Sequence, residues 1–156
     1  MDVLEHLEEE HRKVEQIIAD LEATTTAAER EPLLADLGDA LAKHMDVEQE
    51  RLYPIVDERM GPEVSNRANA EHDTARDDLA RLVDQFDRRE FSRALAKFKE
   101  DLAHHVNEEE SYIFPNLRMN AAHEIADLGD PRKLEDEVQQ ELIDENVELI
   151  DEHLAR

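Results

Sequence analysis

The 156-residue sequence contains no cysteine, and this absence excludes several kinds of site. Disulfide bonds, thiolate nucleophiles, iron–sulfur clusters and cysteine-based zinc sites all require that residue. Tryptophan is also missing, aromatic residues make up only 4% of the chain, and there are three glycines and five prolines. This scarcity, combined with 38% charged residues, favours helices over sheet. We therefore predict an all-α protein.

Basic residues are outnumbered, with 18 Lys and Arg against 42 Asp and Glu and a formal net charge of −24. Nucleic acids and anionic membranes require a basic surface on a protein, so we expect neither as a partner. No apolar run reaches the length of a membrane span. Residues 1–6 also lack the basic and apolar regions of a secretion signal. These features lead us to expect a cytoplasmic protein.

Apolar residues recur at spacings of three and four in four stretches, which predicts four amphipathic helices. Short connections make neighbouring helices antiparallel, so we expect an up-down-up-down four-helix bundle. Gly61 should end the second helix, while Pro54 and Pro115 should kink or end the helices that contain them. Residues 24–31 should form a polar connection. The expected helices are residues 2–23, Pro32 to about residue 60, 62–86 and 91–115.

The chain divides into a bundle domain at residues 1–120 and a C-terminal extension at residues 121–156. We expect a helical tail to about Leu128, a break at residues 129–131 and a fifth helix over residues 133–154. The apolar stripe of this helix must be buried on the bundle, over the site as a lid, or against another subunit. A homodimer through the C-terminal helix is therefore one expected assembly.

Each of the four bundle helices carries one histidine on its apolar stripe, and two of these histidines are followed by a glutamate one turn later. The histidines lie at matching distances from the connections between antiparallel helices, so all four should reach the same height. Buried polar groups are costly unless they are paired or bind a metal ion. We therefore predict one metal site formed by His11, His44, Glu48, His72, His105 and Glu109.

Imidazole and carboxylate groups are ligands of iron, manganese and zinc. Six of them are too many for a four-coordinate zinc site and suit two metal ions of higher coordination number. The His-x-x-x-Glu pattern also occurs at His6 and His104, but these histidines lie off the apolar stripes. Ferritin-like proteins use two Glu-x-x-His motifs, whereas here only Glu8 with His11 matches.

This ordered set of residues, with the aromatic–proline steps at Tyr53–Pro54 and Phe114–Pro115, resembles the haemerythrin-like family, also called the HHE cation-binding domain. The resemblance covers residues 1 to about 120. It implies a cofactor of two non-haem iron ions, bridged by Glu48, Glu109 and an oxo or hydroxo group. Manganese or zinc would be substitutes for iron.

The sequence departs from the oxygen-carrying members of that family. Arg76 stands where the carriers have an additional histidine, and Glu109 stands where they have an aspartate. The pattern is similar to the members with four histidines and two glutamates, which include iron–sulfur repair proteins and actinobacterial proteins with peroxide-decomposing activity. This similarity implies a catalase- or peroxidase-like oxidoreductase acting on H2O2. Two alternatives stay open: a module that binds or senses O2 or NO without turnover, and iron handling or di-iron repair.

Tyr112 follows Glu109 by three residues and His105 by seven, which predicts that it lies on the ligand face. As a catalytic residue, its hydroxyl would occupy a coordination position or donate a hydrogen bond to a bound oxygen species. The alternative is a tyrosine that only packs in the core. Tyr53 is expected to pack, unless the kink at Pro54 redirects it.

Acidic residues beside the ligand histidines would orient the imidazole rings if they accept a hydrogen bond from the outer ring nitrogen. In so acidic a chain, the competing interpretation is a solvated surface. The candidates are Glu10, Glu15 and Glu71.

Overall fold

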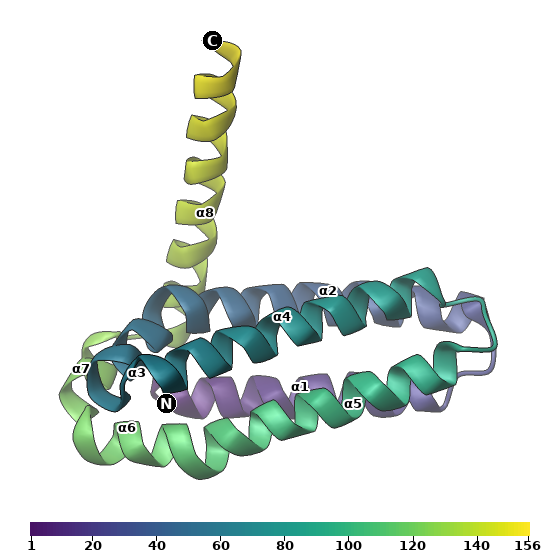
Figure 1. Cartoon of the computed structure of the whole chain (residues 1–156), viewed down its shortest axis with the longest axis horizontal. Coiled ribbons are helices and arrows are strands. Elements are labelled where there is room, and N and C mark those ends of the chain that lie inside the picture. The colour runs from purple at the N-terminus through teal and green to yellow at the C-terminus, as the bar shows by residue number, and fades with distance from the viewer.

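The structure, a computed structural model, describes all 156 residues, and it contains helices and short connections without strands. Four rods lie side by side with alternating direction (Figure 1), which confirms the predicted all-α helical bundle. The α-helices are α1 (Val3–Glu22), α2 (Ala27–Val47), α3 (Tyr53–Met60), α4 (Pro62–Asp84), α5 (Phe91–Glu108), α6 (Phe114–Asn120), α7 (Ala122–Asp127) and α8 (Pro131–Leu154). Two π-helical turns are η1 (Glu48–Leu52) and η2 (Glu109–Ile113). The first and third rods are α1 and α4, the second rod runs through α2, η1 and α3, and the fourth runs through α5, η2 and α6.

The second rod begins earlier than its proline suggests. The predicted start near Pro32 is wrong, because α2 begins at Ala27 and Pro32 lies inside the helix. Thr26 accepts a hydrogen bond from the backbone of Glu29, and the Glu29 side chain accepts one from the backbone of Thr26. This capping box satisfies backbone donors at the helix start, so the polar connection is shorter than expected.

The second and fourth rods each contain a π-helical turn immediately before an aromatic–proline step. In η1 the backbone N–H of Tyr53 bonds to the carbonyl of Glu48, and in η2 the N–H of Phe114 bonds to the carbonyl of Glu109. Pro54 therefore falls in the first turn of α3, where its missing N–H costs little. Each π turn inserts one residue relative to an α-helix, and this insertion changes which later side chains face the bundle interior.

The apolar core consists of two clusters of buried side chains, separated by a polar layer. One cluster includes Leu4 and Leu7 before His11, and the other includes Val14 and Ile18 after it. The same change of cluster occurs in the other rods near their histidines. The polar layer consists of His11, His44, Glu48, His72, His105 and Glu109, all buried.

The predicted break at residues 129–131 is present. Gly129 has a φ of 76°, a conformation that favours glycine, and Asp130 caps the start of α8. The first half of α8 packs against the bundle through Leu134 and Val138, and the helix then projects away from it (Figure 1).

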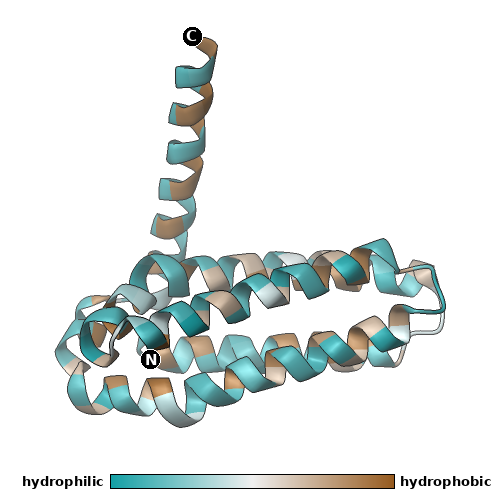
Figure 2. Cartoon of the chain, viewed as in Figure 1, coloured by the Kyte–Doolittle hydropathy of each residue, from teal (hydrophilic) through white to brown (hydrophobic).

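The projecting half of α8 carries an apolar stripe that is exposed in the monomer, visible as brown segments in Figure 2. Its members are Ile143, Val147, Ile150 and Leu154. The homodimer through this helix stays a prediction. None of the helices in the chain combines the length and the apolar character that crossing a bilayer requires.

Candidate metal centre

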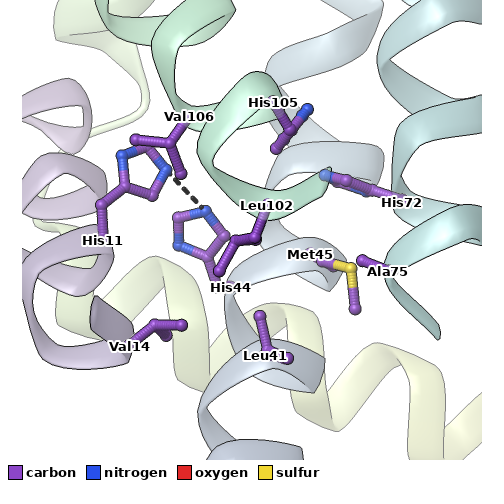
Figure 3. A pocket seen from close by; sticks show the side chains of 10 residues that line it. All are labelled: His11, Val14, Leu41, His44, Met45, His72, Ala75, Leu102, His105 and Val106. Atoms are coloured by element: carbon purple, nitrogen blue, oxygen red, sulfur yellow. Dashed lines mark hydrogen bonds between the residues drawn. The ribbon is translucent and has the colours of Figure 1, made fainter. Parts of the chain in front are cut away.

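The structure brings the six predicted ligands together in the middle of the bundle. The Nε2 atoms of His11 and His44 lie 3.2 Å apart, as the dashed line in Figure 3 shows. The Oε1 atom of Glu48 lies 3.0 Å from Nε2 of His44 and 3.0 Å from Nε2 of His72. These contacts join three of the four rods, and the fourth contributes the remaining two ligands.

Glu109 completes the arrangement from the fourth rod. Its Oε1 atom lies 3.1 Å from Nε2 of His11 and 3.3 Å from Nε2 of His105. The donor atoms form two groups that share Glu48, and the atoms of each group all lie within 4.8 Å of one another. The groups are His11, His44, Glu48 and Glu109, and Glu48, His72 and His105.

The outer nitrogen of every ligand imidazole has an acceptor of its own. When Nδ1 of a neutral imidazole donates to that acceptor, Nε2 directs its lone pair toward the centre, as a metal ligand requires. The distances from Nδ1 to the acceptor oxygens are 2.6 Å for His11 with Glu110, 3.1 Å for His44 with Glu10, 3.1 Å for His72 with Gln49 and 2.9 Å for His105 with Glu71.

Metal ions would satisfy the nitrogen and oxygen atoms of these residues better than the contacts among the residues do. In neutral imidazoles that carry their proton on Nδ1, the Nε2 atoms of His11 and His44 would face each other at 3.2 Å without a proton between them. The Oε2 atom of Glu48 is buried and has no hydrogen-bond partner. Unpaired buried lone pairs are costly, and a cation placed among them would satisfy all of these atoms.

The comparison with protein families agrees with this geometry. The model described as Hemerythrin HHE cation binding domain matches residues 2–117. The chain belongs to the haemerythrin HHE cation-binding family. The searches of curated proteins and of solved structures found no match. The match runs from α1 into α6 and so covers the four helical segments of the bundle, whereas α7 and α8 follow it in the chain.

The centre of this haemerythrin domain is built from two similar halves. The interval from His11 to His72 equals the intervals from His44 to His105 and from Glu48 to Glu109. The acceptors follow the same rule, since Glu10 corresponds to Glu71 and Gln49 corresponds to Glu110. Each helical hairpin thus supplies two imidazoles, one carboxylate and two acceptors to the haemerythrin centre.

Two of the four acceptors were not predicted from the sequence. Of the two interpretations given for Glu10, Glu15 and Glu71, the contact with a candidate ligand histidine holds for Glu10 and Glu71, whereas Glu15 forms an exposed ion pair with Arg12. Gln49 and Glu110 were missed, although each directly follows a ligand glutamate. Their place directly after Glu48 and Glu109 was the feature of the sequence that could have identified them as acceptors.

The predicted position of Tyr112 on the ligand face is wrong. Its side chain lies at the surface and is 48% exposed, because the π turn η2 rotates it away from the centre. Tyr53 occupies the centre instead. Its hydroxyl donates to Glu109 Oε2 at 2.8 Å and lies 2.9 Å from Nε2 of His72.

The electrostatics of the haemerythrin centre favour positive charge. Burial lowers the pKa of His44, but the carboxylates of Glu48 and Glu10 outweigh it and raise that pKa to about 10. Burial also lowers the pKa of His105, but Glu109, Glu48 and Glu71 together outweigh it and raise that pKa well above its ordinary value. Burial raises the pKa of Glu48, yet His44 and the other neighbours lower it by more and hold it well below the usual range. A metal ion would supply the charge that protons supply in its absence.

A small cavity adjoins the four histidines, and no carboxylate is among the residues that line it (Figure 3). Its volume is about 10 Å³, which is roughly the space that the centre of one water molecule needs. Apolar side chains including Leu41, Met45 and Leu102 form most of its wall. The cavity therefore admits a very small molecule next to all four imidazoles.

Proposed function

We propose that the protein holds two iron ions in this centre and decomposes hydrogen peroxide. The observation that carries the proposal is the sharing of Glu48 by two groups of buried donors beside a cavity for a very small molecule. Six nitrogen and oxygen ligands suit two ions of higher coordination number better than four-coordinate zinc. His11 and His44 would hold one ion, and His72 and His105 the other.

Two iron ions supply the two-electron exchange that converts two molecules of H2O2 into two of water and one of O2. The chain itself fixes the geometry. Glu48 contacts His44 and His72, and Glu109 contacts His11 and His105, so either carboxylate would be within reach of both histidine pairs and would help to hold the ions. The acceptors Glu10 and Glu71 keep the imidazoles of His44 and His105 in the tautomer that binds metal.

Tyr53 would give the two iron ions different surroundings. Its hydroxyl lies beside His72 and also 3.4 Å from Nε2 of His105. The corresponding residue in the other half is Phe114, whose ring stacks on His11 with centroids 6.0 Å apart. A hydroxyl group beside only one histidine pair would be available as a ligand at that end of the centre or as a hydrogen-bond donor to peroxide.

The test measures O2 release after H2O2 is added to the iron-loaded protein, with iron counted per chain. We expect O2 release by the wild-type protein and none above background from His105→Ala. A surface variant, Glu15→Gln, serves as a matched control and should retain the activity. Wild-type protein that carries two iron ions yet releases no more O2 than His105→Ala would overturn the proposal.

A second candidate function, binding of O2 or NO without turnover, is favoured by the apolar wall of the cavity. Apolar surroundings suit small uncharged gases, and six of the ten lining residues are hydrophobic. This function predicts a visible spectrum that changes with gas and returns fully when the gas is removed. Reversible spectral change without O2 release from peroxide would favour binding over catalysis.

A further inference from the structure

A second cluster of metal-binding side chains lies where α8 leaves the bundle. His6 and Glu10 are one turn apart on α1, and Glu135 approaches them from α8. The Nε2 atom of His6 lies 3.6 Å from Oε2 of Glu10 and 3.5 Å from Oε2 of Glu135. The three side chains are only 13%, 15% and 18% exposed. The His6 nitrogen is buried and has no hydrogen-bond partner.

The nitrogen-to-oxygen distances in this cluster match the spacing between two ligands of one metal ion better than they match the length of a hydrogen bond. Nitrogen-to-oxygen hydrogen bonds are usually about 2.7–3.2 Å long. Two ligands of a tetrahedral zinc ion, each about 2.1 Å from the metal, lie about 3.4 Å apart. The distances of 3.5 and 3.6 Å from His6 are close to that value. One imidazole and two carboxylates leave a fourth position for water.

The corresponding place in the other half of the bundle already holds a positive charge. Arg67 is the counterpart of His6, and its guanidinium lies 2.5 Å from Oε1 of Glu108. His104, near Glu108, is 72% exposed. The cluster around His6 has no guanidinium, and Lys43 acts on Glu135 only as a neighbouring charge. The cluster therefore has no contact with an arginine or lysine, and the positive group that Glu10 does contact, His44, lies on its other oxygen, Oε1.

We propose that His6, Glu10 and Glu135 form a second site, outside the central one, for a divalent transition-metal ion, with zinc as the best geometric fit. The arrangement of donor atoms supports it. The buried Nε2 atom of His6 has no hydrogen-bond partner, and carboxylates from two helices, Glu10 and Glu135, face it.

The ion at this site would contact both the bundle and α8. It would fix Glu135 of α8 against His6 and Glu10 of α1. Glu10 also links the two sites, because its Oε1 atom accepts from Nδ1 of His44 at 3.1 Å while Oε2 faces His6. Occupancy of the second site would draw charge away from the acceptor of a ligand histidine in the centre.

The experiment counts zinc in the full-length, zinc-saturated protein after dialysis against a low, buffered concentration of free Zn2+. We expect the wild-type protein to hold one more zinc ion per chain than Glu135→Gln. His6→Asn should show the same loss. Both variants leave the six central ligands intact, so the difference does not depend on which metal the centre holds in the cell. Circular dichroism checks that each variant retains its helix content.

Glu108→Gln is the matched control, because it removes a carboxylate from the counterpart cluster at Arg67. This variant should retain the additional zinc ion, and titration calorimetry should find at least tenfold weaker binding in Glu135→Gln than in Glu108→Gln. Equal zinc content in wild type and Glu135→Gln would overturn the proposal. So would an equal loss in Glu135→Gln and Glu108→Gln, because it would indicate unspecific attraction to the acidic surface.

Discussion

The hydroxyl of Tyr53 donates a hydrogen bond to Oε2 of Glu109, at 2.8 Å, across the centre of the bundle. This contact breaks the equivalence of two similar halves. The counterpart of Tyr53 is Phe114, which offers no oxygen and stacks on His11 at an interplanar angle of 7°. The ligand sets of the two halves match, whereas the groups beside them do not.

The first prediction concerns this asymmetry. Tyr53→Phe should change the visible absorption of the iron-loaded protein and lower its rate of peroxide decomposition at least tenfold, because one oxygen beside His72 is removed. Tyr112→Phe should leave both unchanged, since Tyr112 is exposed. Absorption spectra and O2 release on the two variants provide the measurement. A larger effect of Tyr112→Phe than of Tyr53→Phe would contradict the prediction.

The second prediction concerns the acceptors behind the histidines. Glu71→Ala removes the carboxylate that accepts from Nδ1 of His105 at 2.9 Å. Loss of such a partner typically weakens metal binding about 10–100-fold, and we expect a loss in that range from competition with a chelator. Glu15→Ala, which removes only an exposed ion pair with Arg12, should bind metal as the wild type does. Equal affinities for the two variants would show that the acceptor does not tune the ligand.

The convergence of the six candidate ligands could be predicted from the sequence because these residues follow α-helical spacing up to the π turns. His44 with Glu48, and His105 with Glu109, each lie within or at the end of a regular helix. Tyr112 could not be placed in the same way. It lies inside η2, where the inserted residue makes α-helical spacing invalid.

The large number of acidic residues also limits what the sequence can predict about contacts. With 42 acidic residues, a glutamate near a histidine carries little information about contact. Glu10 and Glu15 are equally plausible acceptors in sequence, but only Glu10 reaches a ligand, and that ligand is on another helix. Such contacts depend on how the helices pack against one another, and the spacing of residues along one helix does not predict that packing.

The third prediction concerns the start of α2, where the proline was misleading and the capping box was decisive. Thr26→Ala removes the side-chain acceptor for the backbone N–H of Glu29. Loss of a helix N-cap costs about 1 kcal/mol, which corresponds to a fall in the melting temperature of roughly 2–4 °C for a chain of this size. Thr26→Ser keeps the hydroxyl group and should melt within one degree or so of the wild type. Equal melting of the Ala and Ser variants would exclude a role for the cap.

The fourth prediction follows from the charges in the metal-free centre. The pKa of His44 rises from an ordinary value near 6.5 to about 10 in the folded protein. Its protonated form therefore stabilises the fold fully below pH 6.5 or so, and this contribution is lost as the pH rises toward 10. Glu48 has a lowered pKa, so its contribution is present above its ordinary value of 4.5 and is lost in acid.

Metal binding should reverse the alkaline part of this dependence. A metal ion binds deprotonated imidazole, so stability in the metal-saturated protein no longer requires a proton on His44. Between pH 6.5 and 10, the melting temperature should fall in the metal-free protein and fall less, or rise, in the metal-saturated protein. Metal-free His44→Gln separates this effect from general charge repulsion in the acidic chain, and its melting temperature should vary less with pH than that of the metal-free wild type. Parallel curves for the metal-free wild type and His44→Gln would show that the buried imidazole does not carry the stabilising proton.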